Sequence, residues 1–282
     1  MKKSVVIGLF VLGSMIFMLE NCFAVSALEE ILNKGEIVIS AEANYPPQSY
    51  INEDGKLEGF DISVGKEVAK RLGVKARHVT VDWNLITAGK WSKRWDISIG
   101  SMTPTKERKK VLFFTMPYYS APAQFAIHKN NKTINKVSDL AGKKIGVTTE
   151  STYERYLEKD LIIEDTDIKY QDWKPGKIRT YLADAEYIQD LSLGDGVRLD
   201  AILSSRQTLA EAMSEGCGGS GCPLKMLGDP VYYEPLSFAL DNTRPDSETL
   251  LKKLNEIIQS MYDDGTLVEL SMKFFNTNLI PN

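Results

Sequence analysis

The sequence has little histidine or cysteine, no excess of positive charge, and no long hydrophobic run beyond its first 24 residues. It contains two histidines and three cysteines among 282 residues. His78 and His128 are not spaced as metal ligands, so we expect no metal ion, and no pattern indicates a cofactor. The formal net charge of −4 favours neither nucleic acid nor an anionic membrane surface as a partner. No later stretch approaches the length of a transmembrane helix.

The first 24 residues have the composition of a secretory signal peptide. Lys2 and Lys3 precede an apolar run over residues 5–19, and small residues follow at Ala24 and Ala27. We expect cleavage after residue 24 or 27, which places the remaining protein in the periplasm. The alternative is a retained anchor, although the apolar run is short for a membrane span. A lipid anchor at Cys22 is not expected, because the preceding LEN is a poor context for lipidation.

Two cysteines remain after such processing, Cys217 and Cys222, in the segment GCGGSGC. An oxidising compartment and a spacer of four residues favour a disulfide between them. Closing so short a loop stabilises a protein by about 2 kcal/mol in the chain-entropy account. We therefore expect a stapled surface turn rather than part of a functional site.

Short β-rich runs alternate with amphipathic segments along the rest of the chain. The predicted strands are 35–45, 76–83, 94–100, 143–151, 167–173 and 198–204. The predicted helices are 61–73, 153–160, 183–194 and 247–265. This alternation is typical of parallel sheets covered by helices, so the predicted fold class is α/β.

Two similar segments, QFAIHKN (124–130) and SFALDNT (237–243), flank the second group of predicted elements. Each is an apolar strand followed by polar residues. Two chain crossings at these places predict a first lobe over 25–123 that is completed by 237–282. The second lobe, with its hinge segments, then covers 124–236. The alternative is that both segments are ordinary strands.

The stretch GSMTPTKERKK (100–110) gathers small polar residues ahead of an arginine. Thr103 suits the N-cap of a helix and Pro104 suits its first position. The free N–H groups of such a helix start attract carboxylates, and Arg108 adds a planar fork of donors. The pattern predicts a socket for a small anion, and the alternative is a plain helix start. Three lysines are expected to be solvated charges of that helix: Lys106, Lys109 and Lys110.

Four segments together carry a resemblance to a known family. They are EANYPPQSYINEDGKLEGFDISVGKEVAKRLG (42–73), DISIGSMTPTKERKKVLFFTMPYY (96–119), DLAGKKIGVTTEST (139–152) and GVRLDAILS (196–204). In their order and spacing the chain resembles the family 3 extracellular solute-binding proteins, the receptors of polar amino acid ABC importers. The resemblance implies two α/β lobes joined by two strands, with an amino acid or related small carboxylate held between them. It also implies delivery to an ABC transporter permease by a monomeric receptor.

The resemblance assigns roles to residues of the first lobe. Arg108, helped by Ser101 and Thr103, matches the group that binds the α-carboxylate of the ligand. Glu42 and Tyr45 match an acid and an aromatic residue beside the ligand. Trp83 is expected to be a second aromatic wall, and its alternative is an ordinary core residue.

The second lobe is expected to close on the same ligand. Ser151 and Thr152 match a pair that contacts the ligand after closure, and a simple capping role is compatible with binding. Relatives usually carry an aspartate five residues after the position of Asp200, where it pairs with the α-ammonium group. This sequence has Ser205 there. Either Glu42 or another acid takes that role, or the ligand lacks a free α-amine.

Two other functions are compatible with the same fold. Some periplasmic dehydratases share it, but their general acid would fall near Thr208, whose hydroxyl does not titrate near neutral pH. A ligand-sensing module would need a following transmembrane segment or signalling domain, and we expect neither. Binding for transport, without catalysis, is therefore the preferred interpretation, with the side chain of the ligand left open.

Overall fold

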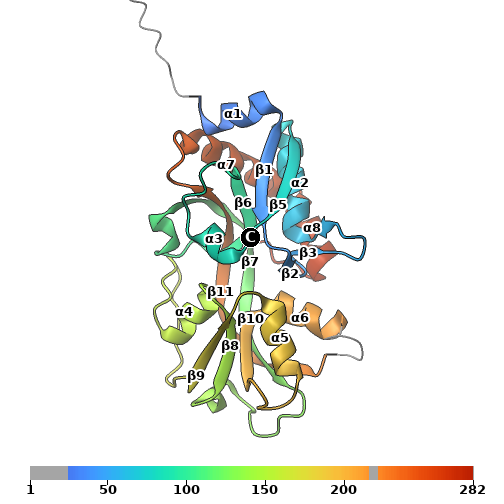
Figure 1. The fold of residues 1–282 in the computed structure, drawn as a ribbon, viewed down its shortest axis with the longest axis vertical. Helices are drawn as coiled ribbons and strands as arrows, with labels where there is room; N and C mark the ends of the chain where they lie inside the picture. The colour runs from blue at the N-terminus through green and yellow to red at the C-terminus, as the bar shows by residue number, and fades with distance from the viewer. Residues whose placement is uncertain (1–24, 216–221, 282) are drawn as a thin grey trace, which may run out of the picture.

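The structure, a computed structural model, describes residues 25–215 and 222–281 (Figure 1). The expected signal peptide and Cys217 lie outside the described residues. The strands are β1 (Glu36–Ala41), β2 (Asn44–Tyr45), β3 (Ser49–Ile51), β4 (Leu57–Glu58), β5 (Lys75–Thr80), β6 (Ile97–Met102), β7 (Leu112–His128), β8 (Lys144–Thr148), β9 (Lys177–Tyr181), β10 (Ala201–Ser205) and β11 (Leu224–Asp241). The helices are α1 (Ala27–Lys34), α2 (Phe60–Leu72), α3 (Trp83–Thr87), α4 (Thr152–Glu158), α5 (Asp184–Ser192), α6 (Arg206–Glu215), α7 (Ser247–Asp263) and α8 (Thr266–Phe275), with 3-10 turns η1 (Arg108–Lys110) and η2 (Val137–Leu140).

Two long strands, β7 and β11, run through the whole molecule and join its two lobes (Figure 1). The main sheet has the order β5-β1-β6-β11-β7-β10-β8-β9, so β7 and β11 lie side by side at its centre, antiparallel to each other. The parallel strands β5, β1 and β6 form the first lobe at one end. The parallel strands β10, β8 and β9 form the second lobe at the other end. The predicted α/β fold of two lobes joined by two strands is confirmed.

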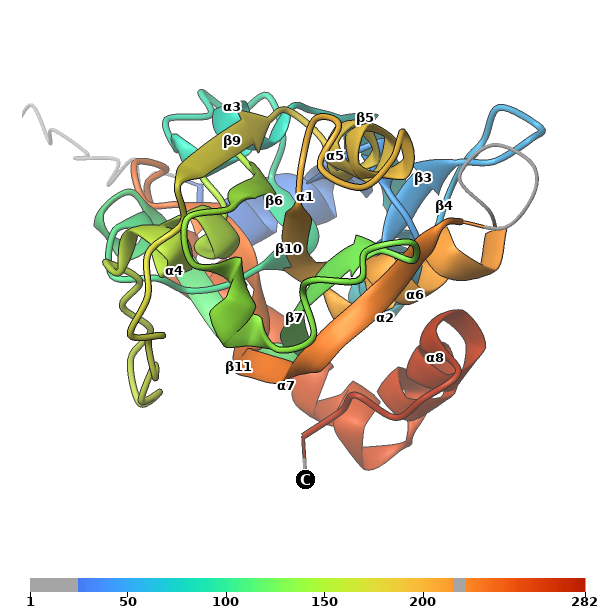
Figure 2. The ribbon, with the colours of Figure 1, turned by 90° about the horizontal axis from the view of Figure 1, so that it is seen from below.

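Each lobe has its own hydrophobic core on both faces of its strands. In the second lobe, Ala201 and Leu203 of β10 pack on the α4 side, while Ile202 packs on the α5 side. This alternation follows from the two-residue period of a strand, and the two helices accordingly cover opposite faces (Figure 2). The first lobe is built in the same way, with α2, α7 and α8 on one face and α3 on the other.

The predicted helices over 61–73 and 247–265 are confirmed by α2 and α7. Gly73 ends α2 in the left-handed conformation, with φ of 74°. Gly59, which precedes α2, has φ of 127°, and a Cβ there would lie 2.3 Å from the Gln48 carbonyl oxygen. Only glycine fits this approach. On α7, successive turns bury one apolar face: Leu250, Leu254, Ile257, Ile258 and Met261.

Two predictions of secondary structure were wrong. Residues 167–173 form no strand, although Ile168, Tyr170 and Trp173 pack partly against the second-lobe core. The segment alternates in burial as a strand does, but its backbone pairs with no neighbouring strand; the strand at this edge is β9. No α-helix begins at Thr103 or Pro104, because the chain there is irregular and only the short turn η1 follows.

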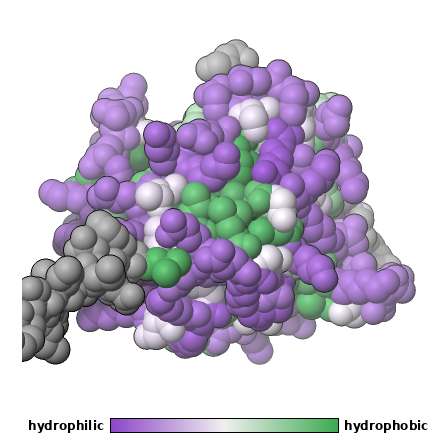
Figure 3. All heavy atoms as spheres, turned by 90° about the horizontal axis from the view of Figure 1, so that it is seen from above, coloured by the Kyte–Doolittle hydropathy of each residue, from purple (hydrophilic) through white to green (hydrophobic). Residues whose placement is uncertain are grey.

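The surface at one end of the molecule is mainly polar (Figure 3). Seen from the end that carries α1, the molecule is mostly hydrophilic around one central group of hydrophobic residues (Figure 3). Among the described residues, no helix combines the length and the apolar character needed to cross a membrane.

Candidate ligand-binding site between the lobes

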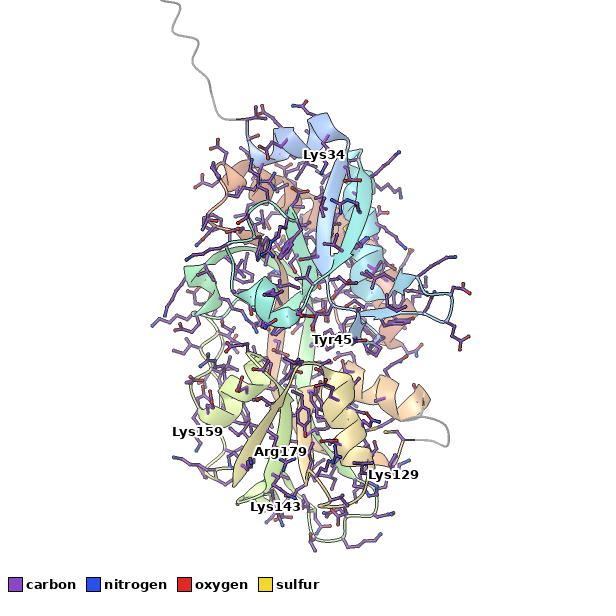
Figure 4. All side chains as sticks on the ribbon, viewed as in Figure 1. Lys34, Tyr45, Lys129, Lys143, Lys159 and Arg179 are labelled. Atoms are coloured by element: carbon purple, nitrogen blue, oxygen red, sulfur yellow. The ribbon has the colours of Figure 1, made fainter. Side chains whose placement is uncertain are left out.

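A small cavity lies between the lobes, beside the crossing strands. Its volume is about 40 Å³, room for about three water molecules. A larger cavity of about 460 Å³ shares Arg108, Ser151 and Thr152 with it. Tyr45, which lines the small cavity, lies at the level where the two lobes meet (Figure 4). The lining residues of the small cavity are Glu42, Tyr45, Trp83, Gly100, Ser101, Thr103, Arg108, Thr148, Ser151, Thr152, Tyr153, Asp184 and Glu234. The structure thus brings together eight of the nine predicted ligand-binding residues, and the exception is Ser205.

Arg108 is a buried cation at this cavity, with 8% of its surface exposed. The Thr105 hydroxyl accepts a hydrogen bond from the Arg108 backbone N–H at 3.2 Å and so starts the turn η1. The guanidinium donates from Nη1 to the Thr103 carbonyl (3.0 Å) and from Nη2 to the Glu150 carbonyl (2.8 Å). Burial lowers the pKa of Arg108 to about 10, so it stays charged at neutral pH. A carboxylate that enters the cavity would therefore meet the Arg108 guanidinium. The N–H groups of the predicted helix start would not take part, because no α-helix begins there.

Trp83 forms an aromatic wall beside Arg108. It is the first residue of α3 and is only 8% exposed. The guanidinium carbon of Arg108 lies 4.9 Å from the centroid of its ring, a cation–π arrangement. The Trp83 side chain therefore packs in the first-lobe core and also lines the cavity. The two alternatives given for this residue are compatible with each other.

The Ser101 hydroxyl is already engaged within the first lobe. It donates to Asp61 Oδ2 at 2.7 Å and accepts from the Tyr119 hydroxyl at 2.6 Å. Tyr118 donates to the other carboxylate oxygen of Asp61 at 2.5 Å. Burial raises the pKa of Asp61 to about 7. Ser101, whose φ is 52°, is thus held in the left-handed region by a buried polar network rather than presenting a free hydroxyl.

Ser151 is the N-cap of α4, as the capping alternative predicted. Its oxygen accepts from the Glu154 backbone N–H at 3.2 Å, and its hydroxyl donates to the Thr148 carbonyl at 2.6 Å. The next residue, Thr152, points its hydroxyl at Glu234 of β11, to which it donates. Thr103 donates to the same carboxylate from the other lobe, at 2.9 Å.

Three carboxyl groups line the cavity against the single guanidinium. Asp184, at the start of α5, accepts hydrogen bonds from the hydroxyls of Thr148 and Ser204, and burial raises its pKa. Burial also raises the pKa of Glu42 to about 8, helped by the nearby charges of Asp184, Asp82 and Asp61. The Glu42 carboxyl forms no hydrogen bond or ion pair with any residue in the described part of the chain. Such a cavity suits a ligand that brings both a carboxylate and a cationic group.

Ser205 lies just behind the cavity. Its hydroxyl donates to Thr208 Oγ1 at 2.9 Å and lies 3.3 Å from the side-chain amide of Gln48 in the other lobe. The Ser205 side chain at the end of β10 is therefore engaged in this hydroxyl network. The nearest acid that lines the cavity from the same lobe is Asp184, which sequence reasoning missed.

Glu234 and Tyr153 were also missed. Glu234 stands in the apolar run YYEPLSFAL, which reads only as a strand, and Tyr153 follows Ser151 and Thr152 as an ordinary helical residue. No spacing in the sequence marks either one. Both reach the cavity because β11 crosses between the lobes and α4 begins at the second-lobe wall.

Additional contacts join the lobes outside the cavity. The backbone N–H of Lys106 donates to the Ile162 carbonyl at 3.0 Å, and Thr105 pairs with Ile163 as a β-bridge. Lys109 forms an ion pair with Glu164 of the second lobe. Lys109 is exposed, as expected, but it also pairs with the other lobe, whereas Lys110 is exposed and, among the described residues, pairs with Glu107 of its own turn.

Comparison with known proteins agrees with this architecture. Residues 37–277 match the family described as bacterial extracellular solute-binding proteins, family 3. The chain is 33% identical over 253 residues to the L-cystine-binding protein TcyJ of Escherichia coli, and the match covers 89% of this chain and 87% of that protein. It is 30% identical over 241 residues to the L-arginine-binding protein of Pseudomonas aeruginosa, which covers 84% of this chain and 87% of that protein.

Solved structures give the same result. An ancestral amino acid-binding protein described as a precursor of cyclohexadienyl dehydratase superposes with a TM-score of 0.74 at 30% identity, covering 89% of this chain and 100% of that one. An ancestral arginine-binding protein bound to arginine superposes with a TM-score of 0.73 at 31% identity, covering 86% and 98%. The chain belongs to the bacterial extracellular solute-binding proteins, family 3.

Proposed function

We propose that this protein captures an amino acid in the cavity between its lobes and presents it to the permease of an ABC importer. The observation that carries the proposal is the buried guanidinium of Arg108 in a cavity that also contains Asp184 and Glu42. A buried cation facing buried acids complements a zwitterion, since each charge of the ligand then meets an opposite charge. Relatives that bind L-cystine and L-arginine support the same class of ligand.

Within that site, Arg108 binds the α-carboxylate of the ligand. A guanidinium binds a carboxylate with two parallel hydrogen bonds, and its two present acceptors are backbone carbonyls that a carboxylate can replace. Trp83 and Tyr45 cover the apolar part of the ligand. Thr103 and Thr152 contact the ligand from opposite lobes, while Ser101 and Ser151 support the walls on which these groups stand.

Asp184, assisted by Glu42, takes the α-ammonium group in place of the acid that relatives carry at the position of Ser205. Asp184 is fixed by two hydroxyl donors, which leaves its remaining lone pairs for a cation. Ser205 instead faces Gln48 of the first lobe, with its hydroxyl 3.3 Å from the side-chain amide. This assignment resolves the missing acid without requiring a ligand that lacks an amine.

The lobes close by bending of β7 and β11. The two sets of core residues divide between Ala121 and Ala123 on β7 and between Tyr232 and Leu236 on β11, which supports lobe boundaries near 123 and 236. Residues 1–24 act as the export signal, and the mature protein works as a monomer in the periplasm. It acts without catalysis, because Thr208, at the position expected for a dehydratase acid, is a buried hydroxyl bonded to Ser205.

The test is a thermal-shift screen of the purified protein against the L-amino acids, L-cystine, opines and small carboxylates, followed by calorimetric titration of the compounds that bind. A bound ligand raises the unfolding temperature by mass action. At least one α-amino acid should give a saturable shift and a one-to-one stoichiometry. A protein that responds to none of these compounds would contradict the proposed function.

A further inference from the structure

The carboxylate of Glu234 lies where the hydroxyls of both lobes converge. Its Oε1 atom accepts a hydrogen bond from Thr103 Oγ1 at 2.9 Å and another from Thr152 Oγ1. Thr103 follows β6 of the first lobe, and Thr152 begins α4 of the second. Glu234 itself belongs to the crossing strand β11, opposite Ala121 of β7, and is 3% exposed. One buried carboxylate oxygen therefore links both lobes at the hinge.

This contact uses the donors that an incoming carboxylate would need. Each threonine hydroxyl has a single proton to donate, so a proton given to Glu234 is not available to a ligand. Burial raises the pKa of Glu234, whereas the hydrogen bonds from Thr152 and Thr103 and the charge of Arg108 lower it. The ionised carboxylate in turn stabilises the charged guanidinium of Arg108, the cation proposed to bind the ligand. A second carboxylate brought into this low-dielectric site meets like-charge repulsion from Glu234.

We propose that Glu234 is an internal carboxylate that competes with the carboxylate of the ligand for Thr103, Thr152 and Arg108, and that holds the two lobes together until the ligand displaces it. The proposal rests on the function proposed above, because it concerns the same site. Its consequence is a selective receptor: only a ligand whose carboxylate binds these donors better than Glu234 does can take its place. Molecules held in this contact do not bind the ligand. The apparent affinity is therefore the intrinsic affinity multiplied by the fraction of molecules in which the contact is open.

Two other roles for Glu234 predict the opposite effect of its removal. If Glu234 received the ammonium group of the ligand, or only positioned the two threonines for binding, neutralising it would weaken binding. The test variant is Glu234→Gln, which removes the charge but keeps a side chain of the same shape with an oxygen that accepts from both hydroxyls. The matched control is Asp229→Asn, which removes one charge from an exposed position of the same strand.

The first measurement needs no ligand. Small-angle scattering of the parent, Glu234→Gln and Asp229→Asn proteins in buffer gives their radii of gyration. The proposal expects a larger radius for Glu234→Gln than for the other two, because hydrogen bonds to a neutral amide oxygen hold the lobes together less strongly than the charge-assisted ones do. Circular dichroism confirms that each variant is folded. A radius equal to that of the parent overturns the role of Glu234 in holding the lobes together.

The second measurement is calorimetric titration of the same proteins with L-arginine and with L-cystine, the ligands of two relatives. For whichever binds the parent, Glu234→Gln should bind tighter by about fivefold or more, the lower range of coupling between sites. Unchanged or weaker binding overturns the competition. If neither compound binds any variant and the wider screen also fails, the proposed function fails, whereas the scattering result still decides whether Glu234 joins the lobes.

A third variant guards against an indirect effect of Glu234→Gln. Thr152→Val removes one donor of the contact from the second-lobe side and should by itself enlarge the ligand-free radius. Combined with Glu234→Gln, it should enlarge the radius by less than the sum of the two single changes, because both changes weaken one interaction. Additive changes in the radius would show that the two residues act separately and would overturn the proposed link.

Discussion

Arg108 and Trp83 bind the same atom of the opposite lobe. The Arg108 guanidinium, stacked over the Trp83 ring, donates to the Glu150 carbonyl oxygen at 2.8 Å, and Trp83 Nε1 donates to that oxygen at 3.4 Å. Glu150 lies between β8 and α4 and has φ of 56°. The aromatic ring therefore orients the guanidinium, and the pair connects the cavity wall of the first lobe to the second.

Replacing Arg108 with alanine should abolish most ligand binding. Removing one partner of a buried, hydrogen-bonded charge pair costs about 2–5 kcal/mol, which is a loss of affinity of about 30- to 4,000-fold. Arg108→Lys should restore only part of it, because an ammonium group cannot form the two parallel hydrogen bonds of a guanidinium. The measurement is calorimetric titration of a bound amino acid into folded variants.

Lys110→Ala is the matched control for this series. Lys110 lies in the same turn, is exposed, and pairs with no residue of the described chain except Glu107, so its loss should change affinity little. Lys109 is a poorer control because its ion pair with Glu164 joins the lobes. Affinity near that of the parent in a folded Arg108→Ala protein would refute the assigned carboxylate partner.

Replacing Asp184 with asparagine should remove the preference for a free α-amine. The parent should bind an amino acid at least about tenfold more tightly than its analogue without the amine. A tenfold difference in affinity has the same free energy as a pKa shift of about one unit. Asp184→Asn should bind the two compounds with similar affinity, since the amide brings no charge to the ammonium group. Titration of both compounds into both proteins measures this difference.

The control for Asp184 is Asp190→Asn on the same helix, where the carboxylate pairs with Arg198 away from the cavity. It should leave the preference for the amine intact. If Asp184→Asn lowered the affinities for both compounds equally, Asp184 would serve the shape of the lobe rather than the ammonium group.

Binding should release a proton near neutral pH. Burial and neighbouring acids raise the pKa of Glu42 to about 8, so at pH 7 its carboxyl is mostly protonated. An ammonium group nearby favours the charged form and lowers this pKa. Affinity should therefore rise with pH up to about 8 and level off above it. Titrations in two buffers of different ionisation enthalpy measure the proton released.

Glu42→Gln tests whether the proton comes from the Glu42 carboxyl. It removes the titrating group, so the affinity should depend little on pH in this variant. The same shift has a consequence for folding. A carboxyl whose pKa is raised in the folded state contributes stability below its unfolded value of 4.5, and that contribution is lost as pH rises through about 8. A pH dependence of affinity that persists unchanged in Glu42→Gln would assign it to another group.

Cys217 and Cys222 should be bonded to each other in the exported protein. Cys222 is fully buried beside β11, and Cys217 lies outside the described residues, so the pairing stays a prediction. Intact-mass measurement after alkylation without reductant should find no labelled thiol, and two labels would disprove the bond. The double substitution to serine should leave ligand affinity unchanged, because Cys222 does not line the cavity.

Much of the fold is predictable where one local pattern determines it. The apolar face of α7 and the glycine at the end of α2 specify those helices without reference to the rest of the chain. Residues 167–173 were misassigned because an alternation of apolar and polar residues indicates packing on one side, and an irregular segment can also pack on one side. Thr103 and Pro104 were misassigned for a different reason: the backbone beyond them bonds to residues 162 and 163 of the other lobe, a contact between distant segments.

The site divides in the same way. Arg108, Ser151 and Thr152 could be proposed because each stands in a segment that resembles the family. Glu234 and Asp184 could not, because an acid within a strand or in the first turn of a helix has ordinary local explanations. Their places at the cavity arise from the crossing of β11 and the approach of α5, which local sequence does not encode.

The separate cores of the two lobes bear on how the protein melts. No hydrophobic cluster of the described residues extends from one lobe into the other, and the lobes share only the two crossing strands and polar contacts. Each lobe is therefore a candidate for an independent cooperative unit, and the free protein can lose one while keeping the other. A ligand held by both walls would merge these units, so that the calorimetric transition becomes narrower as well as hotter.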